Sequence, residues 1–126
     1  MEKVKIGLLL FYLELYDKIA PELRESFNIF VEDIKARLES CEFEIIISPI
    51  CRVDKEFRKA IKDFENLGVK AIVTLHLSYS PSLECINALI STRLPIVVFD
   101  TTMKYHLSHG LNPDDIMNNH GIHGTQ

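Results

Sequence analysis

The amino-acid sequence predicts an α/β fold, a three-layer, doubly wound parallel sheet of the Rossmann or flavodoxin type with about four to five strands. Short apolar runs of strand length alternate along the chain with longer segments whose apolar residues recur at helical spacing. The short runs are continuously rich in valine, isoleucine and leucine, as are strands buried on both faces of a parallel sheet. Right-handed crossovers between such strands give the strand order 2-1-3-4.

The first part of the chain supplies two strands and a long helix. Residues 3–10 (KVKIGLLL) form the first expected strand, and residues 43–48 (FEIIIS) form the second, which Pro49 stops. Pro21 opens the helix between them, and acidic residues in its first turn suit the helix dipole. The apolar stripe of this helix comprises Leu23, Phe27, Phe30, Val31, Ile34 and Leu38.

The middle of the chain continues the alternation of helix and strand. Asp54 is the expected N-cap of the next helix, and Gly68 is its expected C′ residue. Residues 71–75 (AIVTL) then form the third strand. The inward stripe of this helix comprises Phe57, Ile61, Phe64 and Leu67.

A third helix and a fourth strand complete the predicted sheet. Ser80 and Pro81 are the expected N-cap and first residue of this helix. Residues 95–99 (PIVVF) form the fourth strand, which ends at Asp100. The residues expected to face inward from the helix are Leu83, Ile86, Leu89 and Ile90.

Length and composition exclude several classes of protein. A chain of 126 residues is one domain, and its 47% apolar residues argue against a disordered chain. Its net charge of −4 gives no indication that the chain binds nucleic acid or an anionic membrane surface. The apolar run at residues 6–13 is too short to span a bilayer. Cys41, Cys51 and Cys85 lack the spacing of a zinc site or a disulfide framework and favour a reducing, cytoplasmic location.

Residues 103–126 differ in composition from the rest of the chain. This polar segment holds four of the five histidines. Asn112 and Pro113, followed by two aspartates, have the pattern of a helix start. We expect residues 1–126 to be a single N-terminal domain, with this tail leading into a second domain that the sequence does not contain.

Ligands of open α/β sheets bind beyond the carboxyl ends of the strands. No glycine-rich phosphate loop follows the first strand, which argues against dinucleotide-binding and P-loop functions. The polar side chains of the other loops at this edge are therefore the candidate ligand groups. The four loops expected there are residues 11–17, 49–52, 76–80 and 100–102.

Four residues of these loops are candidates whose roles the sequence leaves open. His76 follows a buried strand and is either a structural histidine or a polar group of the ligand crevice. Tyr16 and Tyr79 either cover the sheet edge or line the crevice. Ser80 either only caps its helix or also, with the helix N-terminus, holds a sugar hydroxyl or an anion.

His120 and His123 form the sharpest local motif. On a helix the two imidazoles would share one face and could point at one ligand. A metal site needs a third or fourth ligand, and Asp100, His106 and His109 are the candidates nearby. The histidine pair is therefore expected to hydrogen-bond a substrate or to have a structural role, and no metal ligand or catalytic residue is assigned.

Three segments together resemble the L-fucose/L-arabinose isomerase group. Residues 74–89 (TLHLSYSPSLECINAL) resemble the strand, aromatic-Ser-Pro turn and Ile-Asn-x-Leu helix of that group. Residues 116–124 (IMNNHGIHG) resemble its Met-Asn segment, which ends in His-Gly. Leu15 and Tyr16 resemble a Leu-Tyr pair that follows the first strand in arabinose isomerases. The order and spacing agree over nearly all 126 residues.

The resemblance implies a function. Enzymes of this group interconvert aldoses and ketoses with Mn²⁺ or a similar divalent ion, whose carboxylate and histidine ligands lie in later domains. Their Rossmann-like first domain reaches the active site of a neighbouring subunit, usually within a hexamer, and helps to hold the sugar. By this resemblance, the chain is the substrate-recognition and subunit-contact domain of such an intramolecular oxidoreductase and is inactive alone. Its expected partners are the sugar, the remaining domains and further copies of the protein.

The resemblance also assigns residues. Leu15 and Tyr16 match sugar-proximal positions of arabinose isomerases, and His123 matches a sugar-contacting histidine. Leu13 and His120 stand where arabinose isomerases have glutamines, which favours a branch of the group with an altered substrate. The predicted substrate-binding residues are Leu15, Tyr16, His76, Tyr79, His120 and His123.

Two other functions stay open. The chain could be a stand-alone module of flavodoxin-like fold that binds a sugar or another small molecule. It could also handle metal ions through its histidine-rich tail. Autonomous sugar binding would favour the first alternative, and Zn²⁺ or Mn²⁺ retained through dialysis would favour the second.

Overall fold

A computed structural model describes residues 2–104, 106, 109–110 and 112–119 of the chain. These residues form one four-stranded sheet, in which every pair of neighbouring strands is parallel and the order is β2-β1-β3-β4. The strands are β1 (Val4–Phe11), β2 (Phe43–Cys51), β3 (Ala71–His76) and β4 (Ile96–Phe99). The helices are α1 (Glu14–Ile19), α2 (Leu23–Glu39), α3 (Asp54–Asn66), α4 (Ser82–Ser91) and α5 (Pro113–Asn118).

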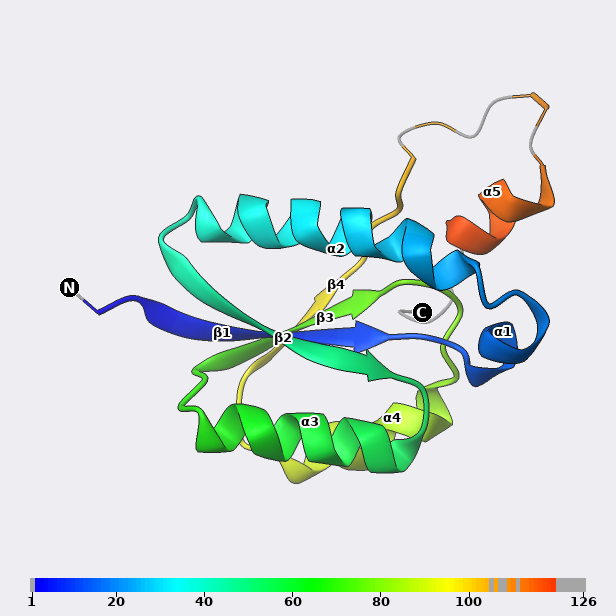
Figure 1. Cartoon of the computed structure of the whole chain (residues 1–126). Coiled ribbons are helices and arrows are strands. Elements are labelled where there is room, and N and C mark those ends of the chain that lie inside the picture. The colour runs from blue at the N-terminus through cyan, green and yellow to red at the C-terminus, as the bar shows by residue number, and fades with distance from the viewer. Residues whose placement is uncertain (1, 105, 107–108, 111, 120–126) are drawn as a thin grey trace.

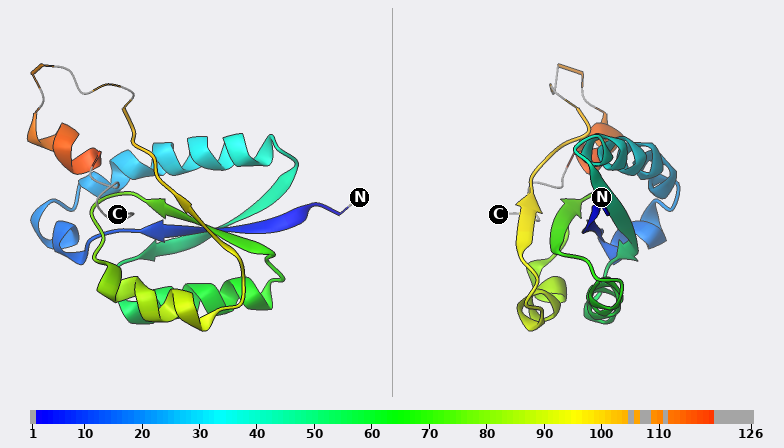
Figure 2. Two further views of the ribbon diagram at one scale, coloured as in Figure 1. Left: turned by 180° about the vertical axis from the view of Figure 1, so that it is seen from behind. Right: turned by 90° about the vertical axis from the view of Figure 1, so that its left-hand side faces the viewer.

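The sheet lies between two layers of helices. Helix α2 covers one face, and α3 and α4 lie side by side on the other (Figure 1). The view along the strands shows the same three layers (Figure 2). The predicted fold class and the predicted strand order 2-1-3-4 are both confirmed.

Two hydrophobic clusters, one on each face of the sheet, hold the layers together. Alternate residues of β1 supply both, because successive side chains of a strand point to opposite faces. Leu8 and Leu10 pack under α2, whereas Leu9 and Phe11 pack under α3 and α4. Each fully buried side chain of this size contributes about 1.5–3 kcal/mol to folding.

A glycine in the central strand β1 lets helix α3 approach the sheet closely. A Cβ atom on Gly7 would lie 2.9 Å from ring carbons of Phe64, a fully buried residue of α3. Any larger residue at this position would therefore push the ring, and with it the helix, away from the strand.

Strand β2 runs through Pro49, so the prediction that this residue stops the strand is wrong. The strand lies at the edge of the sheet, where a missing backbone N–H is tolerated. The pairing with β1 shifts by one residue at this point, from Leu8 opposite Ile47 to Leu10 opposite Ile50. Where the register shifts, the backbone N–H of Leu10 donates to the side-chain Oγ of Ser48 at 3.0 Å, so this N–H keeps a hydrogen-bond partner.

The helix starts differ from the predicted caps. Asp54 is the first residue inside α3, and Val53 is the N-cap. The Asp54 carboxylate accepts a hydrogen bond from Arg58 Nε at 2.6 Å rather than from a backbone N–H of the helix. Helix α4 begins at Ser82 with Pro81 as N-cap, one residue later than predicted, so Ser80 caps nothing. Both predicted N-caps are therefore wrong, since neither side chain accepts a bond from a backbone N–H of its helix.

The predicted end of α3 is confirmed at its C′ residue. Gly68 has a φ of +75°, the left-handed conformation that this position requires. Leu67 just before it is half-exposed rather than part of the inward stripe, because the helix already ends at Asn66.

Helix α4 turns a different face inward than predicted. Cys85 and Ala88 are its buried residues, whereas Leu83, Ile86 and Ile90 are exposed. The helical spacing of the apolar residues is real, but two small residues make the closer contact with the sheet. The predicted stripe is wrong in its direction, and only Leu89 of that set packs against the core.

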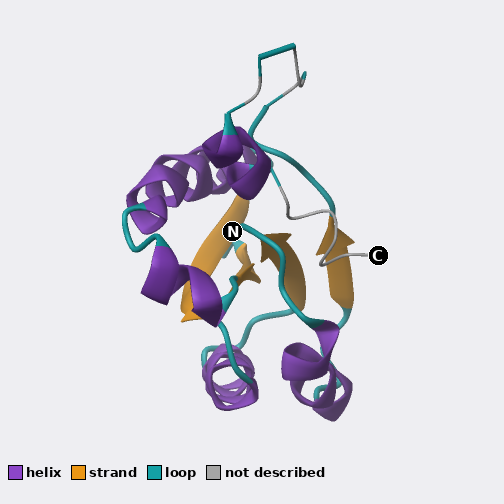
Figure 3. Cartoon of the chain, turned by 90° about the vertical axis from the view of Figure 1, so that its right-hand side faces the viewer, coloured by secondary structure: helices purple, strands orange, loops and turns teal. Residues whose placement is uncertain are grey.

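Two short helices flank the sheet beyond its carboxyl edge, as Figure 3 shows. Helix α1 occupies most of a segment predicted to be a loop. The predicted helix start at Asn112 is confirmed by a capping box, in which Asn112 and Asp115 each accept from the backbone N–H of the other. Asn119 Oδ1 accepts from the backbone N–H of Lys104 at 2.9 Å, and Lys104 also pairs with Asp115.

Candidate ligand site at the carboxyl edge of the sheet

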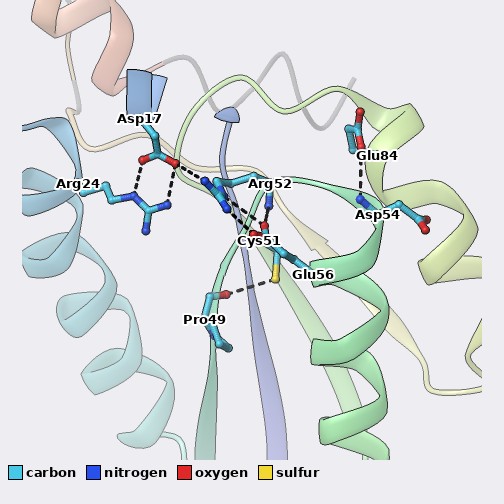
Figure 4. A network of polar contacts seen from close by, with 8 residues as sticks. All are labelled: Asp17, Arg24, Pro49, Cys51, Arg52, Asp54, Glu56 and Glu84. Atoms are coloured by element: carbon cyan, nitrogen blue, oxygen red, sulfur yellow. Dashed lines mark hydrogen bonds and ion pairs between the residues drawn. The ribbon is translucent and has the colours of Figure 1, made fainter. Parts of the chain in front are cut away.

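A row of charged side chains crosses the carboxyl edge of the sheet at β1 and β2 (Figure 4). Asp17 of α1 accepts from Arg24 Nε at 2.5 Å and Nη2 at 2.8 Å, and from Arg52 Nη1 at 2.9 Å. Arg52 also donates to Glu56 of α3, with Nη2 at 2.5 Å from Oε1. The row thus links α1 and α2 to the loop after β2 and the first turn of α3.

The charges of this row neutralise one another. Hydrogen bonds from Arg24 and then Arg52 hold the pKa of Asp17 below its usual value. Hydrogen bonds from Arg52 likewise lower the pKa of Glu56. Two guanidinium groups face two carboxylates, so the row fixes α1 in place and offers no unpaired cation to an anionic ligand.

Tyr12, the residue directly after β1, is fully buried on the α2 side of the sheet. Its ring packs edge-on against Tyr16 and Phe27, and the guanidinium carbon of Arg24 lies 5.5 Å from its centre. Its hydroxyl has no hydrogen-bond partner among the described residues. Burial, and then the charge of Asp17, raise the pKa of Tyr12 to about 12, so the hydroxyl keeps its proton.

His76, the last residue of β3, is buried on the opposite face. Its ring stacks on Phe11 with centroids 4.3 Å apart, and its Nε2 lies 3.1 Å from Thr74 Oγ1. The other ring nitrogen, Nδ1, has no partner among the described residues. Burial lowers the pKa of His76 to about 4 although Asp100 acts in the other direction, so the imidazole is neutral near pH 7.

Two more buried polar atoms without a partner in the described part of the chain lie at or just before the starts of α3 and α4. One is Oγ of Ser80, just before α4, and the other is Oδ1 of Asp54 at the start of α3. The backbone N–H of Asp54 donates to Glu84 Oε2 at 3.3 Å, which brings the first turns of α3 and α4 together.

Three of these unpaired atoms flank the point where the strand order reverses. From β1 the chain passes to β2 on one side, and later from β3 to β4 on the other, so ligands are expected between β1 and β3. Tyr12 follows β1, His76 ends β3, and Ser80 follows β3. The large majority of buried side-chain polar atoms in proteins are hydrogen-bonded, so three unpaired ones near this position require an explanation.

The predicted site residues are divided by the sheet. Tyr16 is buried against Tyr12 under α2, and His76 is buried on the far face, so the two do not meet. Leu15 and Tyr79 are exposed. The predicted sugar-binding residues His120 and His123 lie outside the described residues.

Tyr12 was not among the predicted site residues. Its signal in the sequence is a polar-tipped side chain placed directly after the apolar run of the first strand, at the edge where ligands bind. Asp54 was predicted only as a helix cap, a role that the structure does not give it.

A groove of about 600 Å³ lies between α2 and the segment after β4. The predicted edge loop at residues 100–102 forms one of its walls. The groove is lined by Phe30, Asp33, Ile34, Arg37, Phe99, Asp100, Thr101, Thr102, Met103 and Lys104.

The described residues hold no cluster of metal ligands, and two of their three cysteines are buried. No three His, Cys, Asp or Glu side chains of the described residues come close enough together to hold a metal ion. Cys51 and Cys85 are buried, and burial raises the pKa of both thiols, to about 11 for Cys51. Thiols of this kind are poor nucleophiles near neutral pH.

Comparison with known proteins leaves the family open, since no family model matches the chain and no curated protein matches it. The resemblance to sugar isomerases therefore stays a prediction from sequence. No helix in the described residues has the length and apolar character needed to cross a membrane.

Proposed function

We propose that the chain binds a sugar at the carboxyl edge of its sheet, between the ends of β1 and β3, as the substrate-recognition and subunit-contact domain of a divalent-metal-dependent aldose–ketose isomerase-like protein. The supporting observation is three unpaired buried polar atoms on residues that end or follow these strands, Tyr12 Oη, His76 Nδ1 and Ser80 Oγ. Tyr12 lies on the α2 face and His76 on the opposite face, so a ligand completes the hydrogen bonds of both by lying across the carboxyl ends of the two strands.

The chemistry of the three groups suits a polyhydroxylated ligand. All are uncharged near pH 7, because burial keeps the proton on Tyr12 and off His76. Sugar hydroxyls both donate and accept, so they match a hydroxyl and a neutral imidazole whichever tautomer the histidine adopts. A phosphate group fits less well, since Arg24 and Arg52 are already paired with carboxylates.

The remaining parts of the proposal rest on the resemblance. Mn²⁺ or a similar ion, which polarises the sugar carbonyl, would be held by later domains, and the residues of this chain bind and orient the sugar. The unpaired thiols suit a cytoplasmic protein. His120 and His123 are proposed as further sugar contacts, and association with other subunits is proposed as in the hexameric relatives.

A stand-alone sugar-binding module is the second candidate. It is favoured by the two complete hydrophobic clusters, which already bury both faces of β1 without any further domain. The two candidates differ in what the 126-residue chain does by itself. A stand-alone module binds its sugar tightly as the isolated chain, whereas a recognition domain binds weakly until the other domains are present.

Ligand-observed NMR on the 126-residue chain tests the proposal. The probes are L-arabinose and L-fucose, their ketose forms and, as a non-sugar control, a nucleotide. Saturation transfer to a sugar that is lost in His76→Phe and kept in His109→Ala supports the proposal, because His109 is exposed and distant in sequence from the site. Phenylalanine keeps the stacking on Phe11 while removing Nδ1. Equal transfer in both variants would contradict the proposed site.

A further inference from the structure

The two ring nitrogens of His76 lie in different surroundings. Nε2 is 3.1 Å from Thr74 Oγ1, whereas Nδ1 is buried and has no partner among the described residues. A neutral imidazole carries its proton on one nitrogen only, which donates a hydrogen bond while the other nitrogen accepts one. What His76 offers to a ligand therefore depends on which of its nitrogens is protonated.

The hydroxyl of Thr74 favours a proton on Nδ1. Thr74 is 1% exposed, and His76 Nε2 is the one hydrogen-bond partner of its hydroxyl among the described residues. A protonated Nε2 would donate to Thr74 Oγ1, and the hydroxyl hydrogen would then be buried without an acceptor. With the proton on Nδ1, the hydroxyl donates to the bare Nε2, and only the Nδ1–H is left for a further partner.

Nδ1 is also the nitrogen that faces the carboxyl edge of the sheet. Nε2 points back along β3 toward Thr74, which precedes His76 by two residues and lies on the same face of the sheet. The two nitrogens of an imidazole ring point in nearly opposite directions. Nδ1 therefore points forward, toward the edge at which β3 ends.

Asp100 follows β4 at this edge and favours the same tautomer. Strands β3 and β4 pair up to Leu75 opposite Phe99, and His76 and Asp100 are the next residues of the two segments. Among the described residues, Asp100 is the charge that acts on His76. A negative charge on this side of the ring stabilises an N–H that points toward it, so it favours a proton on Nδ1 over one on Nε2.

We propose that Thr74 and Asp100 are positioning residues that fix the proton of the neutral His76 ring on Nδ1, so that His76 presents a hydrogen-bond donor at the carboxyl edge of the sheet. The role of this donor in binding rests on the proposed function. There, the sugar atom that meets His76 is an acceptor, either a hydroxyl oxygen or the carbonyl oxygen of the open-chain form. A carbonyl oxygen only accepts, so the other tautomer would leave it without a partner.

Nitrogen-15 NMR of the labelled 126-residue chain at pH 7 measures the tautomer without any ligand. Protonated and bare ring nitrogens have well-separated chemical shifts, and through-bond connections to the backbone identify the signals of His76. The expected result is a protonated Nδ1 and a bare Nε2. A proton on Nε2, or an equal mixture of the two tautomers, would overturn the proposal.

Two variants of Asp100 separate its charge from its shape. Asp100→Asn keeps the shape and removes the charge, so the ratio of the Nδ1–H to the Nε2–H tautomer should fall about threefold. The pKa of His76 should also fall, because Asp100 raises it in the wild type. Asp100→Glu keeps the charge and should preserve both values. An unchanged ratio and an unchanged pKa in Asp100→Asn would remove Asp100 from this role.

The matched control is Asp33→Asn, which removes an exposed negative charge from α2, on the other face of the sheet. It should change neither the tautomer ratio nor the pKa of His76. Thr74→Val replaces the hydroxyl by a methyl group and should lower the ratio, since Nε2 loses its donor. Circular dichroism confirms that each variant is folded. A ratio that Thr74→Val leaves unchanged would show that the hydroxyl does not help to fix the proton.

A sugar titration in the same NMR experiment separates the tautomer from the binding site. L-Arabinose or L-fucose, when bound, should shift the Nδ1 resonance, because the N–H gains an acceptor, and should leave Nε2 in place. A protonated Nδ1 that neither sugar shifts would refute the proposed sugar site and leave the tautomer assignment intact. A proton on Nε2 in a chain that binds sugar would instead overturn the positioning roles of Thr74 and Asp100 alone.

Discussion

Arg52 and Asp17 are 35 residues apart in the sequence and meet at the carboxyl edge of the sheet, where Arg52 Nη1 donates to Asp17 Oδ2 at 2.9 Å. Asp17 also holds Arg24 of α2. One carboxylate of a six-residue helix thus ties together the loop after β2 and the long helix on the α2 face. This pairing positions α1, and with it Tyr16, over the buried ring of Tyr12.

Removing the charge of Asp17 is expected to destabilise the fold. Asp17→Asn should lower the free energy of unfolding by about 1–2 kcal/mol, since two charge-assisted pairs lose their acceptor charge in a partly buried place. Asp33→Asn is the control, because the Asp33–Arg37 pair is largely exposed and should contribute less than about 0.5 kcal/mol. Urea unfolding at pH 7 measures both. Equal losses would show that the Asp17 network adds nothing beyond a surface pair.

The contribution of Asp17 should also depend on pH. Its pKa is lowered in the folded state, so its stabilisation is complete above the unfolded pKa and is lost as the pH falls through the folded value. The difference in unfolding free energy between the wild type and Asp17→Asn should therefore shrink below about pH 4. A difference that stays constant down to pH 2.5 would contradict the lowered pKa.

His76 should make the stability of the fold depend on pH in a higher range than Asp17 does. Its folded pKa of about 4 lies below the unfolded value, so the unfolded chain takes up a proton first as the pH falls. Stability is complete above the unfolded pKa near 6.5 and then falls by up to about 1.4 kcal/mol per pH unit. Urea unfolding between pH 7 and pH 4.5 should show this slope in the wild type. His76→Phe should flatten it, and an unchanged slope would assign it to another group.

Tyr12→Phe is expected to stabilise the protein. The variant removes a buried hydroxyl that has no partner among the described residues and keeps the ring, so the free energy of unfolding should rise by about 1 kcal/mol. Tyr79→Phe is the control. Because Tyr79 is exposed, removing its hydroxyl should change the free energy of unfolding by less than about 0.5 kcal/mol. A clear loss of stability in Tyr12→Phe would mean that the hydroxyl is satisfied in solution.

Gly7→Ala is expected to cost about 1–3 kcal/mol, because the new methyl group would overlap the ring of Phe64. Combining it with Phe64→Leu should cost less than the sum of the two single changes, since the smaller side chain relieves the overlap. Gly68→Ala meets no neighbouring atoms, and its cost of about 1 kcal/mol comes from the backbone alone. Thermal unfolding of the four variants distinguishes the two causes.

The sequence predicts the sheet well because its signals are local. Continuous apolar runs mark the four strands, and the alternation with helices fixes their order through handedness. Pro49 was misleading because its effect depends on β2 being an edge strand with a register shift, which is a property of the whole sheet. The inward face of α4 is hard to predict for a similar reason, since the spacing of Leu83 and Ile90 is helical whether these residues face the core or, as here, are exposed.

The candidate site is less accessible from sequence. His76 and Tyr16 were predicted from their places after strands, but no pattern shows that the sheet separates them. The charged row depends on contacts between distant segments, such as Asp17 with Arg52. The unpaired state of Tyr12 depends on what surrounds its hydroxyl in three dimensions, which a single sequence does not encode in any short motif.

Ser80→Ala provides the most direct test of the proposed ligand site. The variant removes a buried, unpaired hydroxyl, so it should leave the free energy of unfolding unchanged or raise it by up to about 1 kcal/mol. If the hydroxyl instead serves a ligand, the same variant should bind its sugar about tenfold more weakly. The measurement is calorimetric titration of both proteins with L-arabinose and L-fucose, together with urea unfolding. Unchanged or raised stability with weakened binding is the predicted result, and equal affinity in the two proteins would contradict the site.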